Sequence, residues 1–312
     1  MTVRLLVAAR SDVGRLRSGN EDAFLVVDDL QLVAVADGMG GHQGGEVASA
    51  TAIETLHTGM ARGDAIGLAI TTANDAVFTQ AAADLALRGM GTTITAGILT
   101  DGSLRIGHVG DSRAYLLRAG ELRQLTTDHS VVAELIAAGQ LTEDEALVDP
   151  RRAMITRALG IDALVEVDVF DVLLEPGDRV LLCSDGLTTM VRDHAIAEII
   201  TSEHDRERAA DELVNAANIA GGADNITVVV VDVVDAADAA DAADAADPDA
   251  TAEVPVVDDA TAEADADTEP VPVVVDDPVV TDDEDPDLEA LRAAVEDGEP
   301  PRRHWWQRRS RS

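Results

Sequence analysis

Short apolar runs that follow one another closely, with turn residues beside them, most restrict how this chain can fold. Runs typical of strands are expected at about 3–9, 23–28, 31–36, 93–100, 103–109, 112–118, 165–173, 178–183 and 226–234. Asp28–Asp29, Asp101–Gly102 and Ala119–Gly120 mark tight turns next to such runs. Two-residue turns join neighbouring strands that run in opposite directions, so the pattern predicts antiparallel pairing.

Helical periods are expected at about 43–61, 64–85, 129–138, 193–201 and 205–219. Strands cluster with strands and helices with helices, instead of alternating as βαβ units. This order favours an α+β or layered sandwich architecture over a doubly wound parallel sheet.

The composition changes near residue 234, which predicts a folded domain over residues 1–234. Residues 235–312 hold 24 of the 60 acidic residues but only 6 of the 23 arginines. Repeated acids with few large side chains bury too little surface to offset ordering entropy, so 235–286 is predicted to be a disordered acidic linker. A short helix is expected at 287–298, followed by a basic tail at 299–312.

The basic tail contains both tryptophans of the chain, Trp305 and Trp306, and five arginines. One interpretation is a docking peptide for an anionic surface, either of a partner or of the protein's own acidic face. The other is a solvated basic end.

The formal net charge is −37, and all 23 basic residues are arginine. This charge repels nucleic acid phosphates from the folded domain and suits cations. Without lysine, no P-loop lysine, kinase lysine or Schiff base is available. The single cysteine, Cys183, fits a reducing compartment, and neither a signal peptide nor a transmembrane run is found, so a cytoplasmic protein is expected.

Acidic residues recur at the boundaries of the predicted strands. They are Asp37 and Asp185, each followed by glycine at a strand end, Asp111 between two strands, Asp224 before the last strand, and Glu21 and Asp22 at a strand start. A single Asp-Gly is usually a turn, but gathered carboxylates are costly to bury without a cation. Hard oxygen donors select Mg²⁺, Mn²⁺ or Ca²⁺ rather than Zn²⁺, and two such ions form the usual clamp for phosphoryl hydrolysis.

Eight ordered motifs over residues 3–233 resemble bacterial PPM-type, protein phosphatase 2C-like, Ser/Thr phosphatases. They are SDVGRLRSGNEDA, VADGMGGHQGGEVAS, GTTITAGIL, HVGDSRAYLLR, LTTDHS, ITRALG, LLCSDGL and ADNITVVVV. The resemblance implies a four-layer sandwich of two packed antiparallel β-sheets flanked by α-helices. It also implies hydrolysis of phosphoserine and phosphothreonine in proteins by a metal-bridging water, opposing Ser/Thr protein kinases, with two Mn²⁺ or Mg²⁺ ions per active site.

The resemblance assigns the metal ligands residue by residue. Asp37 looks like the carboxylate that bridges both metals, and Gly38 like a carbonyl ligand. Asp185 and Asp224 are similar to the remaining ligands of the first metal, and Glu21 to the acid that serves the second. Asp111, with Asp185, resembles the site of a more weakly held third metal.

The same resemblance assigns the groups around the metals. Arg17 matches the arginine that holds the substrate phosphate, and Asp22 and Asn225 match residues that orient ligands and waters. Residues 126–160 resemble a flap beside the active site, and His129 in its DHS motif is a candidate substrate contact.

The chain departs from the family pattern directly after the Asp-Gly pair. Eukaryotic relatives have a histidine there as the proposed general acid, whereas this chain has Met39. His42, three residues later, is a candidate proton donor, with the alternative that it caps the following helix.

Two other functions are compatible with parts of the pattern. The first is a pseudophosphatase, or a regulatory module that binds phosphoproteins; retention of every acid and of Arg17 speaks against it. The second is an aspartyl-phosphate phosphatase, which is disfavoured because Asp37 is followed by Gly38 and Met39 and not by D-x-D.

Overall fold

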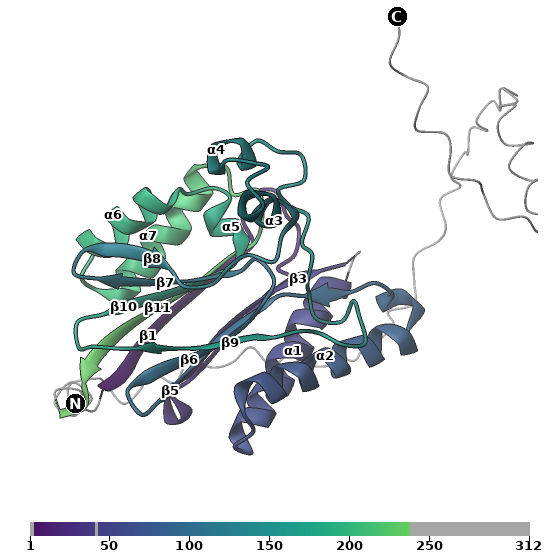
Figure 1. The fold of residues 1–312 in the computed structure, drawn as a ribbon, viewed down its shortest axis with the longest axis horizontal. Coiled ribbons are helices and arrows are strands. Elements are labelled where there is room, and N and C mark those ends of the chain that lie inside the picture. Colours follow the sequence, from purple (N-terminus) through teal and green to yellow (C-terminus); the bar gives the residue numbers. More distant parts are fainter. Residues whose placement is uncertain (1–2, 41–42, 238–312) are drawn as a thin grey trace, which may run out of the picture. The chain divides into compact units, whose positions relative to one another are not determined.

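Two antiparallel sheets, packed face to face, carry helices on both outer faces (Figure 1). The computed structural model describes residues 3–40 and 43–237. The linker beyond Ala237, the helix predicted at 287–298 and the tail at 299–312 lie outside the described residues. The arrangement confirms the predicted α+β four-layer sandwich.

Each sheet has five strands in a row, and one of them carries an additional short strand. Sheet A consists, in spatial order, of β1 (Val3–Asp12), β11 (Ile226–Asp235), β10 (Arg179–Cys183), β7 (Arg113–Arg118) and β8 (Glu121–Gln124). Sheet B consists of β2 (Asp22–Val27), β3 (Leu32–Met39), β5 (Ile94–Thr100), β6 (Ser103–Val109) and β9 (Asp168–Leu173), with β4 (Gly91–Thr92) paired to β3.

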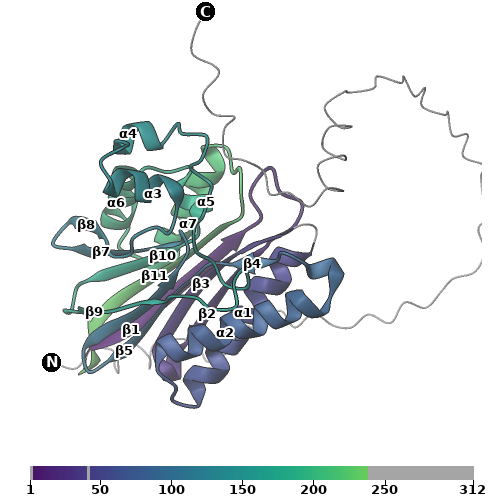
Figure 2. The same cartoon turned by 45° about the vertical axis from the view of Figure 1, so that its right-hand side comes forward.

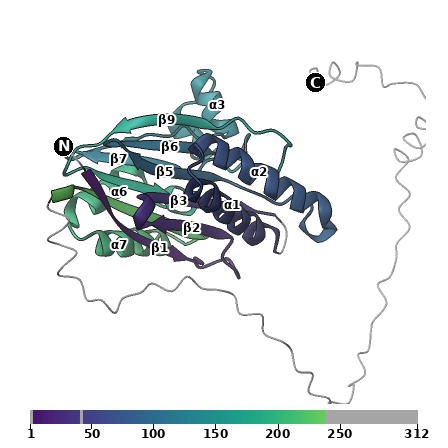
Figure 3. The same cartoon turned by 90° about the horizontal axis from the view of Figure 1, so that it is seen from below.

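Helices cover the outer face of each sheet (Figures 1 and 2). On sheet B lie α1 (Gly44–Ala61) and α2 (Ile66–Ala83), and on sheet A lie α5 (Asp185–Thr188), α6 (Asp193–Ser202) and α7 (Arg206–Ile219). Seen from below, α6 and α7 lie on one side of the strands and α2 lies on the other side (Figure 3). The predicted flap contains α3 (Val131–Ala137) and α4 (Glu143–Ala146), and single 3₁₀ turns occur at Asp28–Leu30 and Leu85–Leu87.

The central strands are apolar on both faces because both faces are covered. Successive side chains of a strand point to opposite sides of its sheet. On β10, Val180 and Leu182 therefore join the core between the sheets, whereas Leu181 and Cys183 pack under the helices of sheet A. Three layers of core thus separate four layers of secondary structure.

Several short elements escaped sequence analysis. β4, β8, α4 and α5 have two to four residues each, too few to show a period. The strand predicted at 178–183 ends where β10 ends, at Cys183, but Asp185 begins α5 instead of closing the strand. The Thr189 amide donates to the Asp185 carbonyl oxygen at 2.8 Å. β3 continues past Asp37 to Met39, because Gly38 and Met39 pair with β4.

Among the helices of the described residues, none combines the length and apolar character needed to cross a bilayer.

Candidate metal centre

Asp37 is held rigidly on β3. It is the register partner of Asp22 on β2. The Asp37 amide donates to Thr93 Oγ1 at 2.9 Å, and the Thr93 amide donates to the Asp37 carbonyl oxygen at 2.9 Å. Thr92 Oγ1 donates to that same oxygen, also at 2.9 Å. The sheet therefore fixes the backbone from which the Asp37 carboxyl group extends.

Asp185 and Asp224 come from sheet A, on two segments that lie against each other. Asp185 opens α5, and Asp224 lies two residues before β11. A Cβ atom on Gly186 would lie only 1.9 Å from the Asn225 carbonyl oxygen. The glycine of this second Asp-Gly pair is thus required for the close approach of the segment that carries Asp224.

Ser184 joins the two sheets beside these acids. Its hydroxyl donates to Asp22 Oδ2 at 2.7 Å and accepts from the Thr227 amide at 3.0 Å. The second Asp22 oxygen, Oδ1, is buried and has no hydrogen-bond partner among the described residues. A buried carboxylate oxygen without a partner is costly unless a cation or a proton satisfies it.

The acids of the site raise one another's pKa. Burial is the largest cause for Asp37, whose pKa lies well above its ordinary value, and the charges of Asp22, Asp185 and Asp111 add to it. Burial also raises the pKa of Asp22 and of Asp111 to about 7, and burial with repulsion by Asp224 raises that of Asp185 to about 6. Acids in this state ionise readily only beside a cation.

Arg17 and Glu21 lie beside these acids. Arg17 Nη2 donates to Asp224 Oδ2 at 2.8 Å, and Nη1 lies 3.7 Å from Glu21 Oε2. The Arg17 side chain is 45% exposed, so its guanidinium is accessible to a ligand. Asn225 Oδ1 accepts from the Glu21 amide at 2.8 Å, and Asn225 Nδ2 donates to the Gly19 carbonyl oxygen at 2.9 Å. These bonds support the predicted orienting role of Asn225.

The residues present fit hard divalent cations. All the converging side-chain donors are carboxylates, one buried carboxylate oxygen has no partner, and glycines leave room for close approach. Across residues 3–40 and 43–237, no three acidic, histidine or cysteine side chains already form a ready-made metal-binding group. Ligation therefore requires the carboxylates to move closer together around the positive charge of a cation.

His129 anchors the flap, residues 126–160, to the turn that carries Asp111. Its side chain is 8% exposed. Nδ1 accepts from the Gly110 amide at 3.0 Å, which leaves the proton on Nε2, 3.2 Å from Asp168 Oδ2. Arg157 Nη1 donates to Asp168 Oδ1 at 2.8 Å. A substrate contact by His129 stays a prediction.

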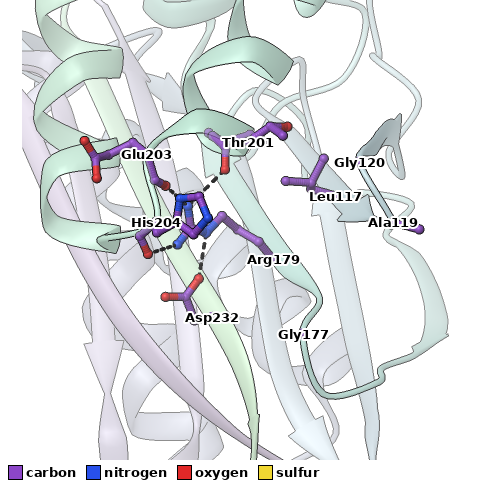
Figure 4. Close-up of a pocket in the computed structure, with 10 residues that line it drawn as sticks. Leu117, Ala119, Gly120, Gly177, Arg179, Thr201, Glu203, His204 and Asp232 are labelled. Atoms are coloured by element: carbon purple, nitrogen blue, oxygen red, sulfur yellow. Dashed lines mark hydrogen bonds and ion pairs between the residues drawn. The ribbon is translucent and has the colours of Figure 1, made fainter.

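A hollow of about 300 Å³ lies away from these acids, around Arg179 (Figure 4). Arg179 begins β10, whereas Asp185 follows the other end of that strand. The Arg179 guanidinium donates to Asp232 Oδ1 at 2.6 Å and to the Ile200 and His204 carbonyl oxygens at 3.0 and 2.8 Å. These bonds occupy the donors of the guanidinium and hold α6 against the sheet. We therefore assign Arg179 a structural role and propose no binding site in this hollow.

Sequence reasoning missed the hydroxyl groups that support the acids. Thr93 Oγ1 lies 2.7 Å from Ser112 Oγ, next to Asp111, and Ser184 bridges the sheets as described. For Ser112 and Ser184 the one signal is adjacency to an acid in the chain, and Thr93 has no such signal. His42, the candidate proton donor, lies outside the described residues.

Comparisons with known proteins agree with this geometry. The model of the protein phosphatase 2C family matches residues 15–218. Serine/threonine phosphatase stp of Listeria monocytogenes serovar 1/2a is 42% identical over 233 residues, covering 70% of this chain and 92% of the relative. Protein phosphatase PhpP of Streptococcus pneumoniae serotype 2 is 38% identical over 238 residues, covering 71% and 95%.

Solved structures agree as well. The crystal structure of the serine/threonine phosphatase PstP/Ppp of Mycobacterium tuberculosis has a TM-score of 0.68 and 40% identity, covering 73% of this chain and 98% of that one. A PstP catalytic domain in complex with two manganese ions has a TM-score of 0.69 and 40% identity, covering 75% and 100%. Fold and site define a layered α+β protein with a carboxylate centre for divalent cations. The chain belongs to the protein phosphatase 2C family.

Proposed function

We propose that this chain is a metal-dependent phosphatase that hydrolyses phosphoserine and phosphothreonine in proteins, and so opposes Ser/Thr protein kinases. The observation that carries the proposal is the convergence of half-buried carboxylates from both sheets beside the half-exposed guanidinium of Arg17. Membership of the protein phosphatase 2C family, with relatives that are Ser/Thr phosphatases, supports it.

The proposed ligands are Asp37, the Gly38 carbonyl, Asp185, Asp224 and Glu21. When bound, divalent cations supply an activated water and neutralise charge on the phosphoryl oxygens. The chain's own contribution is to bring these donors from both sheets to one place.

Arg17 is proposed to hold the substrate phosphate. A guanidinium offers a planar pair of donors that matches two phosphoryl oxygens. Asp22 and Asn225 are proposed to orient the ligands, through the Ser184 hydroxyl and the Glu21 amide. Met39 has no proton to give to the leaving group, so His42 is the proposed proton donor, with the alternative that it caps the following helix.

The proposed cations are Mn²⁺ or Mg²⁺, two per site, with a third served by Asp111 and Asp185. Carboxylate and carbonyl oxygens are the donors that these hard ions take. The manganese complex of PstP, a relative at 40% identity, supports a pair of ions.

The proposed partners are phosphorylated proteins and the kinases that modify them, in the cytoplasm. One cysteine in 312 residues, Cys183, is buried and fits a reducing compartment. The excess of acidic residues repels nucleic acid from the folded part of the chain.

The basic tail is proposed to dock on an anionic surface, of a partner or of this protein. Trp305 and Trp306 are the only tryptophans in the sequence, so intrinsic tryptophan fluorescence observes the tail alone. Docking predicts a blue-shifted emission maximum relative to the free peptide 299–312. An emission maximum equal to that of the peptide, with and without phosphoprotein partners, would reject docking.

The proposed function is tested by Asp37→Asn in a Mn²⁺-dependent assay on a phosphothreonine peptide. Loss of a direct ligand should lower the rate at least about a hundredfold, since even outer partners of metal ligands are worth 10–100-fold. The control is Asp171→Asn, an exposed acid paired with Arg105 at 2.8 Å on β9. Full activity of Asp37→Asn would reject the site, and peptide binding without turnover by the wild type would indicate a pseudophosphatase.

A further inference from the structure

The start of α1 lies against two of the proposed ligands at Gly45. A Cβ atom on Gly45 would lie 2.7 Å from Glu21 Cδ, 2.9 Å from Glu21 Oε2 and 2.9 Å from the carbonyl carbon of Gly38. Real Cβ atoms essentially never approach other heavy atoms within 3.0 Å. A methyl group at this position must therefore displace the Glu21 carboxylate, the Gly38 carbonyl, or both.

The contact is tight from the other side as well. A Cβ atom on Gly38 would lie 2.1 Å from the Gly45 carbonyl oxygen and 2.4 Å from the Glu21 carbonyl oxygen. The Gly38 amide also donates to the Glu21 carbonyl oxygen at 3.1 Å. The end of β3, the start of β2 and the first turn of α1 thus meet without intervening side chains.

Backbone conformation does not explain the glycine at position 45. Gly45 is the second residue of α1 and has no positive φ, unlike Gly40, whose φ is +142°. Within a helix glycine is less favourable than alanine, because it loses more conformational freedom on folding. Glycine at position 45 therefore lowers helix stability, and the reason for glycine there is the lack of space for a side chain, not the backbone conformation.

We infer that Gly45 is a positioning residue of the metal centre: its missing side chain fixes where the Glu21 carboxylate and the Gly38 carbonyl stand. This inference rests on the proposed function, in which both groups are metal ligands and Glu21 serves the second cation. Arg17, at 3.7 Å, is the single cation found within 4 Å of the Glu21 carboxylate among the described residues. The close approach of Gly45 is a steric constraint on where this carboxylate can stand. Asp185 and Asp224 lie on sheet A segments, and the atoms nearest to a Cβ on Gly45 belong to Glu21 and Gly38, not to them.

The test compares Gly45→Ala with Gly44→Ala, the neighbouring residue of the same helix. A Cβ atom on Gly44 would meet only Met90, at 3.2 and 3.8 Å, so both variants gain the same helix propensity but only one reaches the ligands. Mn²⁺ binding is counted by equilibrium dialysis and electron paramagnetic resonance, without substrate. Gly44→Ala should bind as the wild type, whereas Gly45→Ala should keep one ion and bind the other about tenfold or more weakly.

A second pair of variants separates positioning from general support of the fold. If Gly45 acts through Glu21 and Gly38, Glu21→Ala/Gly45→Ala should retain the same single ion as Glu21→Ala, with dissociation constants within threefold of each other. Loss of that remaining ion on addition of Gly45→Ala would overturn the inference, as would wild-type binding of both ions by Gly45→Ala. Failure of both Gly45 variants to fold, judged by circular dichroism, would also overturn it. A wild-type protein that binds no Mn²⁺ would instead reject the proposed function itself.

Discussion

Arg17 and Asp224 are joined by a hydrogen bond of 2.8 Å between Nη2 and Oδ2, and the same guanidinium lies 3.7 Å from Glu21. One arginine thus contacts two proposed metal ligands, although its own proposed task is to hold phosphate. A guanidinium and a divalent cation compete for the same carboxylate oxygens, because both are positively charged. Arg17 therefore links the binding of cations to the binding of phosphate.

Arg17→Gln should change these two affinities in opposite directions. Without the competing charge, the half-saturating Mn²⁺ concentration should fall by about two- to fivefold, as expected for a partly exposed ion pair. Without the planar donor pair, KM for a phosphothreonine peptide should rise by about tenfold or more. Steady-state kinetics over a grid of Mn²⁺ and peptide concentrations measures both.

Arg10→Gln is the matched control, because Arg10 pairs with Glu207 and Asp211 on α7, away from the metal centre. It should leave both constants unchanged. Weaker Mn²⁺ binding by Arg17→Gln would show instead that Arg17 helps to assemble the cation site.

Cation binding should release protons and weaken as the pH falls. In the structure the pKa of Asp22 and of Asp111 is about 7, and that of Asp185 is about 6, mainly through burial. A cation favours the ionised form of these carboxyl groups, whether they bind it, as proposed for Asp185 and Asp111, or lie beside it, as Asp22 does. Each bound proton therefore competes with the cation. Below about pH 6 the dissociation constant for Mn²⁺ should rise at least about tenfold per pH unit.

Calorimetric titration in two buffers of different ionisation enthalpy counts the released protons. The expected count at about pH 6.5 is one or more per protein. A count of zero, with a dissociation constant independent of pH, would contradict the shared burial of these acids.

Asp185→Asn should stabilise the metal-free protein at neutral pH, although it removes a ligand. Burial raises the pKa of Asp185 from 3.8 to about 6. Because the folded state holds this proton more tightly than the unfolded state, the stabilisation exists at low pH and is lost as the pH rises through about 6. The amide avoids this loss, so the free energy of unfolding at about pH 7.5 should exceed that of the wild type by about 1–3 kcal/mol. Denaturant unfolding in chelator measures it.

The advantage of Asp185→Asn should fade towards about pH 4, where the wild-type carboxyl group is protonated. Asp149→Asn is the control of opposite sign. A hydrogen bond from Arg151 lowers the pKa of Asp149 to about 2, so its loss should give no gain at neutral pH. A lower free energy of unfolding for Asp185→Asn than for the wild type at every pH would show that ionisation of Asp185 does not destabilise the metal-free protein.

The antiparallel layers were predictable where a turn fixes the pairing. Asp101–Gly102 places Thr100 opposite Ser103 and Leu99 opposite Leu104, because a two-residue turn joins only antiparallel neighbours. The gathering of the acids was predictable for a related reason, because strand boundaries at one end of a sandwich come together in space. By contrast, β8 has four residues, Glu121–Gln124, and lies at a sheet edge, so neither length nor periodicity indicates it.

The supporting contacts were not predictable, because they join residues far apart in the chain. The Ser184 hydroxyl accepts from Thr227, 43 residues away, and donates to Asp22, 162 residues away. Gly45 likewise cannot be distinguished in the sequence from the other glycines around it. Its role follows only from its contact with Glu21 in the structure. Such roles depend on close approach between sheets and helices, which local patterns do not encode.

His129→Ala should release the flap from the turn before Asp111. The substitution removes the acceptor of the Gly110 amide and the donor to Asp168, and leaves a cavity in place of a buried ring. Two lost hydrogen bonds should favour local opening by about 1–3 kcal/mol. Trypsin should therefore cut after the exposed Arg152 at least about fivefold faster than in the wild type, when opening is rapid relative to cleavage. His204→Ala changes an exposed histidine that follows the end of α6, and this variant should be cut at the wild-type rate. Equal rates for both variants would mean that other contacts hold the flap closed.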